Sequence, residues 1–107
     1  MIAQQTIDQV KEKLVKEFNP VEIYLHGPYV WGQPEPEEAE LEILMVVEKL
    51  DTDRYNMLVR GQHVLGDLNV AKDLRIFTKD EFDRSAHDAT RLCYQIKLRG
   101  LRVYAKA

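Results

Sequence analysis

Apolar residues recur along the chain at two spacings, one typical of helices and one typical of strands. Ile7, Val10, Leu14 and Phe18 follow the helical spacing, and Asn19-Pro20 ends that run. The same reasoning predicts helices that begin at Asp51 or Thr52, after Thr78, and near Ala89. Strand patterns cover residues 21–27, 40–47, 73–78 and 101–105.

The predicted order of elements is α-β-loop-β-α-β-α-α-β over residues 1–107, which we interpret as a single domain. This order predicts an α+β fold with a mixed β-sheet, and the simplest arrangement packs the helices mainly on one face. In the second helix we expect an inward row of apolar residues, comprising Tyr55, Leu58, Val59 and Leu65.

The composition is that of an ordinary globular protein. Of its 107 residues, 45% are hydrophobic and 31% are charged, with a net charge of −3. That charge argues against general nucleic-acid binding through phosphate contacts. Cys93 is the single cysteine, which excludes an internal disulfide and fits a reducing compartment. Because no apolar run approaches the roughly 20 residues that span a bilayer, we expect a cytoplasmic protein without a membrane partner.

Two glutamates, Glu40 and Glu42, lie at the start of the second predicted strand. Alternation along a strand directs both side chains to the same face. Two carboxylates that lie this close to each other need a cation between them or a proton on one of them. Mg²⁺ prefers oxygen ligands, and Asp73 would add a third if its strand lies beside this one. The alternative, two solvated side chains at a strand end, is favoured by the spacing alone.

The turn before this strand changes that balance. Strand 21–27 ends in His26-Gly27 and leads into a loop rich in glycine and proline. Glycine at such a turn lets the backbone approach phosphates. A phosphate cradle followed by a carboxylate clamp is the combination that phosphoryl and nucleotidyl transfer require. His26 itself is expected to be an ordinary strand-end side chain.

The segment YLHGPYVWGQPEPEEAELEILMVV resembles the signature of the minimal nucleotidyltransferases, small relatives of DNA polymerase β. Their pattern is a strand, Gly-Ser, a second glycine, Asp-x-Asp in an apolar strand and a third aspartate on a later strand. The segments KDLRIFTKDEFD and YQIKLRGLRVYAKA extend the resemblance, which covers about residues 21–107.

The resemblance implies a role for six positions. Gly27 and Pro28 stand at the Gly-Ser positions and Gly32 at the second glycine, where the family binds nucleotide phosphates. Glu40, Glu42 and Asp73 stand at the metal-binding carboxylates, and Asp73 is the catalytic one, which helps to activate an attacking hydroxyl. The implied cofactor is Mg²⁺, with Mn²⁺ as the alternative, and the implied substrate is a nucleoside triphosphate.

Four residues depart from the family pattern. Pro28 offers neither a hydroxyl nor an amide N–H. Each glutamate is longer than aspartate by one methylene, and a misplacement of ~1 Å can cost about 100-fold in rate. Arg75 lies on the same strand face as Asp73, where relatives carry an apolar residue. Two interpretations of Arg75 stand equally: it pairs with Glu42 or Asp73 in place of a metal, or it extends from an edge strand into water.

Two functions therefore remain open. The first is an active enzyme that transfers a nucleotidyl group from a nucleoside triphosphate to a hydroxyl acceptor. The second is a catalytically inactive member that binds a helical protein of the HEPN type, as an antitoxin-like partner. The final strand, LRVYA, also leaves open a homo-oligomer formed edge to edge.

Overall fold

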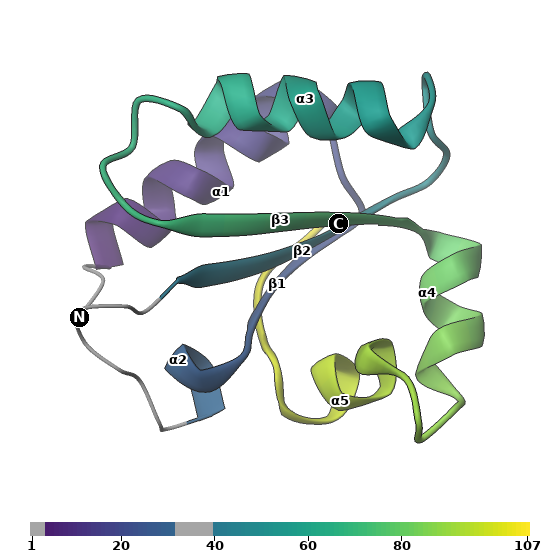
Figure 1. Ribbon diagram of the computed structural model, residues 1–107. Helices are drawn as coiled ribbons and strands as arrows, with labels where there is room; N and C mark the ends of the chain where they lie inside the picture. Colours follow the sequence, from purple (N-terminus) through teal and green to yellow (C-terminus); the bar gives the residue numbers. More distant parts are fainter. Residues whose placement is uncertain (1–3, 32–39) are drawn as a thin grey trace.

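In the computed structural model, which describes residues 4–31 and 40–107, a mixed sheet lies between two layers of helices (Figure 1). The helices are α1 (Gln4–Phe18), α2 (Pro28–Trp31), α3 (Arg54–Leu65), α4 (Lys79–Ala86) and α5 (Leu92–Arg99). The strands are β1 (Glu22–His26), β2 (Leu41–Val47), β3 (Lys72–Thr78) and β4 (Leu101–Ala105). The predicted α+β class and mixed sheet are confirmed.

The strands of the described sheet follow the order β3-β2-β1-β4. β1 is antiparallel to both of its neighbours, whereas β2 and β3 are parallel. Parallel neighbours need a long crossover connection, and α3 lies within the one between β2 and β3. The register places Glu42 opposite His26 on one side and opposite Asp73 on the other.

Helices cover both faces of the sheet, so the expectation that they pack mainly on one face is wrong. α1 and α3 lie on one face, and α4 and α5 lie on the other (Figure 1). The physical reason is visible in β2, which is buried along almost its whole length. Its sequence, LEILMVV, has apolar residues at consecutive positions, which is typical of a strand covered on both faces.

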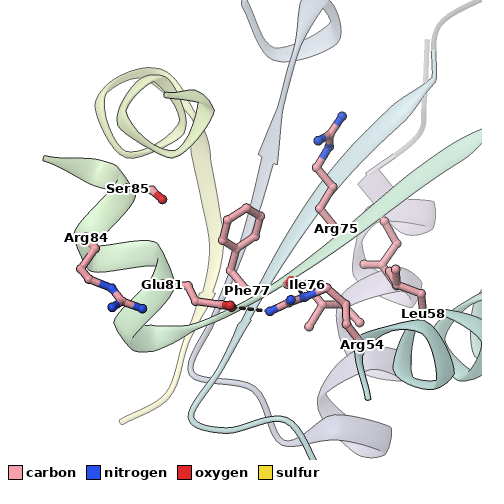
Figure 2. A pocket seen from close by; sticks show the side chains of 9 residues that line it. Arg54, Leu58, Arg75, Ile76, Phe77, Glu81, Arg84 and Ser85 are labelled. Carbon is pink, nitrogen blue, oxygen red and sulfur yellow. Dashed lines mark hydrogen bonds and ion pairs between the residues drawn. The ribbon is translucent and has the colours of Figure 1, made fainter. Parts of the chain in front are cut away.

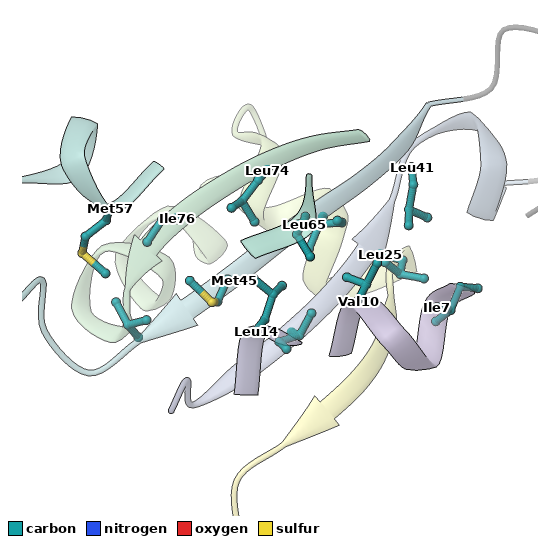
Figure 3. Close-up of a cluster of buried hydrophobic side chains, with 13 residues drawn as sticks. Ile7, Val10, Leu14, Leu25, Leu41, Met45, Met57, Leu65, Leu74 and Ile76 are labelled. Atoms are coloured by element: carbon teal, nitrogen blue, oxygen red, sulfur yellow. The ribbon is translucent and has the colours of Figure 1, made fainter. Parts of the chain in front are cut away.

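The larger apolar cluster lies between the sheet and the helices α1 and α3. Val10 and Leu14 of α1 meet Leu25 and Met45 of the sheet there (Figure 3). The predicted inward row of α3 is confirmed for Leu65, and Leu58 packs against the cluster, but Tyr55 and Val59 face away from it. The buried residues of α3 are Met57, Gly61 and Leu65, whereas Tyr55 is 74% exposed and Val59 is 38% exposed.

Side-chain caps set two of the helix starts. Asp53 accepts a hydrogen bond from the N–H of Asn56, so α3 begins slightly later than Asp51 or Thr52. The predicted capping box between Thr78 and Glu81 is present at the start of α4. In the described part of the chain, no helix combines the length and the apolarity needed to cross a membrane.

Candidate functional site

The predicted site residues that the structure describes lie where the end of β1 meets the beginnings of β2 and β3. His26, Glu42 and Asp73 occupy directly opposite positions on these three strands. Side chains at opposite positions project from the same face of a sheet. Glu42 is two residues from Leu44, which packs in the cluster beneath α4 and α5. The register therefore brings Asp73 beside Glu42, on the face that α4 and α5 cover.

Gly27 fits tightly against Glu42. Its φ of 87° lies in the left-handed region that favours glycine. A Cβ atom at this position would lie only 1.7 Å from Glu42 Oε2, so the carboxylate covers the Gly27 backbone. Pro28 follows at once and begins the short helix α2, exposed to solvent. Glycine at position 27 is thus required by its φ and by the closeness of this contact.

The surroundings of Glu42 disfavour the charged form of its carboxylate. Burial raises the pKa of Glu42, and the neighbouring charges of Asp73 and Glu40 raise it further. Arg75 acts in the opposite direction and lowers it. Glu40 is exposed, and Asp73 is half-buried. This excess of negative charge is the condition that a bound cation or proton would relieve.

Arg75 is drawn into this group. Its Nε lies 3.4 Å from Oδ2 of Asp73, so the predicted pairing with a carboxylate is present, while the replacement of a metal by Arg75 stays a prediction. Both side chains are substantially exposed, at 51% for Arg75 and 39% for Asp73. The guanidinium therefore neutralises part of the cluster from its solvent side.

His26 is the residue whose burial the sequence reasoning missed. It is 1% exposed, and within the described residues neither ring nitrogen has a hydrogen-bond partner. Its Nδ1 lies 4.0 Å from Oε1 of Glu42, too far for a hydrogen bond. Burial lowers the pKa of His26, followed by the charge of Arg75, while Asp73 raises it. The imidazole is therefore held in its neutral form, next to an acid held toward its protonated form.

The donor chemistry of the site suits a hard cation, although its side chains do not converge as a ligand set. Carboxylate oxygens are the ligands that Mg²⁺ prefers. Across residues 4–31 and 40–107, however, no three His, Cys, Asp or Glu side chains are arranged to hold a metal ion. Gly32, the predicted second phosphate-binding glycine, lies outside the described residues.

No protein-family model matches this sequence, and no curated protein is significantly similar to it. The resemblance to nucleotidyltransferases therefore depends on the motif residues themselves. The features that bear on the function of the site are the Gly27 turn, the three carboxylates and the strand register.

Proposed function

We propose that the chain has a nucleotidyltransferase fold and transfers a nucleotidyl group from a nucleoside triphosphate to a hydroxyl acceptor. The observation that carries this proposal is the register of β2 and β3, in which Glu42 lies directly opposite Asp73. Beside this pair, Gly27 makes the close turn that the family motif requires. Burial and then the charges of Asp73 and Glu40 raise the pKa of Glu42, as expected where carboxylates are gathered for a cation.

Each residue has a defined part in this proposal. Glu40, Glu42 and Asp73 would hold Mg²⁺ or Mn²⁺ after their side chains converge, and the metal would supply charge neutralisation at the phosphates. Because the Glu42 carboxylate covers Gly27, it has to rotate outward before phosphates reach the backbone there. Arg75 also has to release Asp73 from their ion pair. Both movements involve side chains only.

Asp73 then acts on the acceptor. Its carboxylate accepts the proton of the acceptor hydroxyl, and the oxygen forms a bond to the α-phosphorus. The bond between the α-phosphorus and the bridging oxygen breaks, and pyrophosphate leaves with the electron pair. The extra methylenes of Glu40 and Glu42 and the missing N–H of Pro28 make this a slow enzyme.

The test is label transfer from α-labelled nucleoside triphosphates in the presence of Mg²⁺ or Mn²⁺. We expect label on the protein itself, on an added protein or on tRNA, and loss of that label in Glu42→Gln and Asp73→Asn. Asp67→Asn is the matched control, since Asp67 pairs with Lys13 of α1, on the other face of the sheet. Labelling by Asp73→Asn at the wild-type rate, or no labelling and no triphosphate binding, would contradict the proposal.

The ion pair between Asp73 and Arg75 favours a second candidate function. In this alternative the guanidinium takes the place of the metal, and the inactive fold serves as the binding partner of a helical HEPN-type protein. Arg75→Leu separates the two candidates, because it removes the positive charge and leaves the carboxylates. If Arg75 replaces the metal, the variant binds Mn²⁺ at least about tenfold more tightly than the wild type. Equal Mn²⁺ affinity, with activity in both proteins, would leave only the enzyme.

A further inference from the structure

A groove of about 430 Å³ follows the free edge of β3, outside the carboxylate cluster. Its floor consists of four consecutive residues of β3, Leu74 to Phe77, and its walls come from α3 and α4. β3 is the last strand on its side of the sheet, so the described residues place no strand beyond it. A volume of this size is within the usual range for small-molecule sites.

The residues that line the groove carry more positive than negative charge, although the whole chain carries −3. Three arginines line it, Arg54, Arg75 and Arg84, together with one carboxylate, Glu81. Figure 2 shows the Arg54 guanidinium directed to Glu81, with Arg75 and Arg84 at separate points around the Phe77 ring. The groove therefore offers cationic groups at its margin and an aromatic ring near its centre.

Each arginine keeps hydrogen-bond donors that the described residues do not use. A guanidinium has five N–H groups. Arg54 uses Nε on the carbonyl of Ile76 and Nη2 on Glu81, which leaves Nη1. Arg75 contacts Asp73 through Nε, and Arg84 has no ion pair within the described part of the chain. Arg54 is fixed in place by its two partners, which reduces the entropy that a ligand must overcome.

The contact between Arg54 and Ile76 also decides which kind of occupant fits. It covers a main-chain carbonyl that an added β-strand would need, and charged side chains at a sheet edge oppose such pairing. An extended peptide is therefore disfavoured. An aromatic ring can instead stack on Phe77, which is half-buried, while the arginines bind an anionic group of the same molecule.

We propose that this groove is a second small-molecule site, for a compound that joins an aromatic ring to a phosphate group, such as a nucleoside monophosphate. The site does not depend on the activity of the carboxylate cluster and requires no metal. Arg75 belongs to both regions, because it lines the groove and contacts Asp73. An anion bound at Arg75 competes with Asp73 for the guanidinium and so releases that carboxylate.

The experiment is a titration of the ¹⁵N-labelled protein with AMP in EDTA, followed through backbone amide shifts. EDTA removes divalent metal, so binding at the carboxylate cluster does not contribute. We expect shifts at Arg75, Phe77 and Ser85, and binding that is at least about tenfold weaker for adenosine, which lacks the phosphate. Inorganic phosphate, which lacks the ring, should also bind more weakly than AMP.

Arg84→Gln and Arg102→Gln form the matched pair of variants. Arg84 is exposed on the groove wall, whereas Arg102 is exposed on β4, at the opposite edge of the sheet. We expect Arg84→Gln to weaken AMP binding about tenfold and Arg102→Gln to change it by less than about twofold. Thermal melting confirms that both variants fold.

Three results would overturn the proposal. The first is AMP shifts concentrated at Gly27 and Glu42 instead of the groove. The second is equal AMP affinity for Arg84→Gln and Arg102→Gln, or for AMP and adenosine. The third is no shift at millimolar AMP, which corresponds to a Kd above about 1 mM. None of these results depends on nucleotidyl transfer, so failure here is distinguishable from failure of the proposed function.

Discussion

One glutamate lies at each end of the parallel pair β2 and β3, and the pKa values of these two glutamates shift in opposite directions. Beyond the carboxyl ends, Glu81 accepts hydrogen bonds from the N–H of Thr78 at 2.8 Å and from Arg54. The Thr78 backbone bond is the main reason that the pKa of Glu81 is lowered. At the amino ends, burial and two neighbouring carboxylates raise the pKa of Glu42. The charged carboxylate of a glutamate is therefore stabilised at the carboxyl ends, by Glu81's hydrogen bonds, and disfavoured at the amino ends, at Glu42.

This difference separates a stabilising region from a candidate functional one. The network of Arg54, Thr78 and Glu81 joins α3, β3 and α4, and its charges meet partners. The group of His26, Glu42 and Asp73 instead contains two neighbouring like charges and a buried imidazole that finds no hydrogen-bond partner among residues 4–31 and 40–107. Natural proteins violate local rules chiefly at functional sites. Four substitutions test whether the two regions differ in this way.

The largest expected effect is that of Gly27→Ala. A left-handed φ of 87° and the contact with Glu42 together should cost about 2 kcal/mol or more in free energy of unfolding. Chemical denaturation measures the loss. Gly66→Ala is the control, because Gly66 has an ordinary helical φ of −65°. Adding Glu42→Ala to Gly27→Ala should recover the part of the loss that comes from the clash, and no recovery would show that the carboxylate does not limit this turn.

The next effect is that of Glu81→Gln, which removes the charge of the hydrogen-bonded glutamate beyond the carboxyl ends of β2 and β3. At pH 7 we expect a loss of about 1 kcal/mol, after allowing for solvent screening at a carboxylate that is 34% exposed. Because the folded pKa of Glu81 lies below its ordinary value of 4.5, this stabilisation is present above that pH. It disappears as the pH falls through the folded pKa.

Denaturation curves between pH 7 and pH 3 check this prediction. Asp80→Asn is the control, since Asp80 is an exposed residue in the first turn of the same helix. A loss for Glu81→Gln that persists unchanged at the lowest pH would contradict the charge-based explanation.

A gain in stability is expected for His26→Leu, beside Glu42 at the amino ends of β2 and β3. A buried polar group without partners costs about 1–3 kcal/mol, and leucine removes that cost in a site already closed to water. We therefore expect Tm to rise by about 4–8 °C for a gain of ~1 kcal/mol. His63→Leu, at an exposed position on α3, should leave Tm nearly unchanged. A fall in Tm for His26→Leu would mean that the imidazole has a partner in solution.

The smallest effect is that of Glu42→Gln, measured in EDTA. Removing one of the repelling charges should raise the free energy of unfolding by a few tenths of a kcal/mol, the opposite sign to Glu81→Gln. Glu40→Gln, at an exposed position, should give a smaller gain. If Glu42→Gln and Glu81→Gln destabilise the protein equally, the contrast between the two ends fails.

Local signals in the sequence predicted much of the fold. The capping box of Thr78 and Glu81 and the strand LRVYA were correctly located because each depends on neighbouring residues only. The side of α3 that faces the sheet was predicted only in part, since Leu65 is buried but Tyr55 and Val59 are exposed. Gly61 packs against Leu74, where an added Cβ would lie 2.4 Å from the leucine Cδ2. A helix phase set by this close approach to β3 has no local signature.

The candidate site divides in the same way. Alternation along a strand predicted Glu40 and Glu42 on one face, whereas β2 begins at Leu41, after Glu40. Only the register of two strands separated by α3 places Asp73 opposite Glu42. The burial of His26 at the end of β1 was not predicted, because the second layer of helices, α4 and α5, was not expected on its face of the sheet. The apolar sequence of β2 was the signal for that second layer, since a strand with one solvated face alternates polar and apolar residues.

The parallel pairing of β2 and β3 has a consequence for the folding of the protein during its synthesis on the ribosome. Glu42 and Asp73 meet only across a crossover of many residues, and distant pairings of this kind form slowly. During synthesis, β1 and β2 are able to form their antiparallel ladder before β3 has emerged. The repulsion between the two acids thus arises only when the third strand docks, so a high salt concentration should speed that late step by screening it.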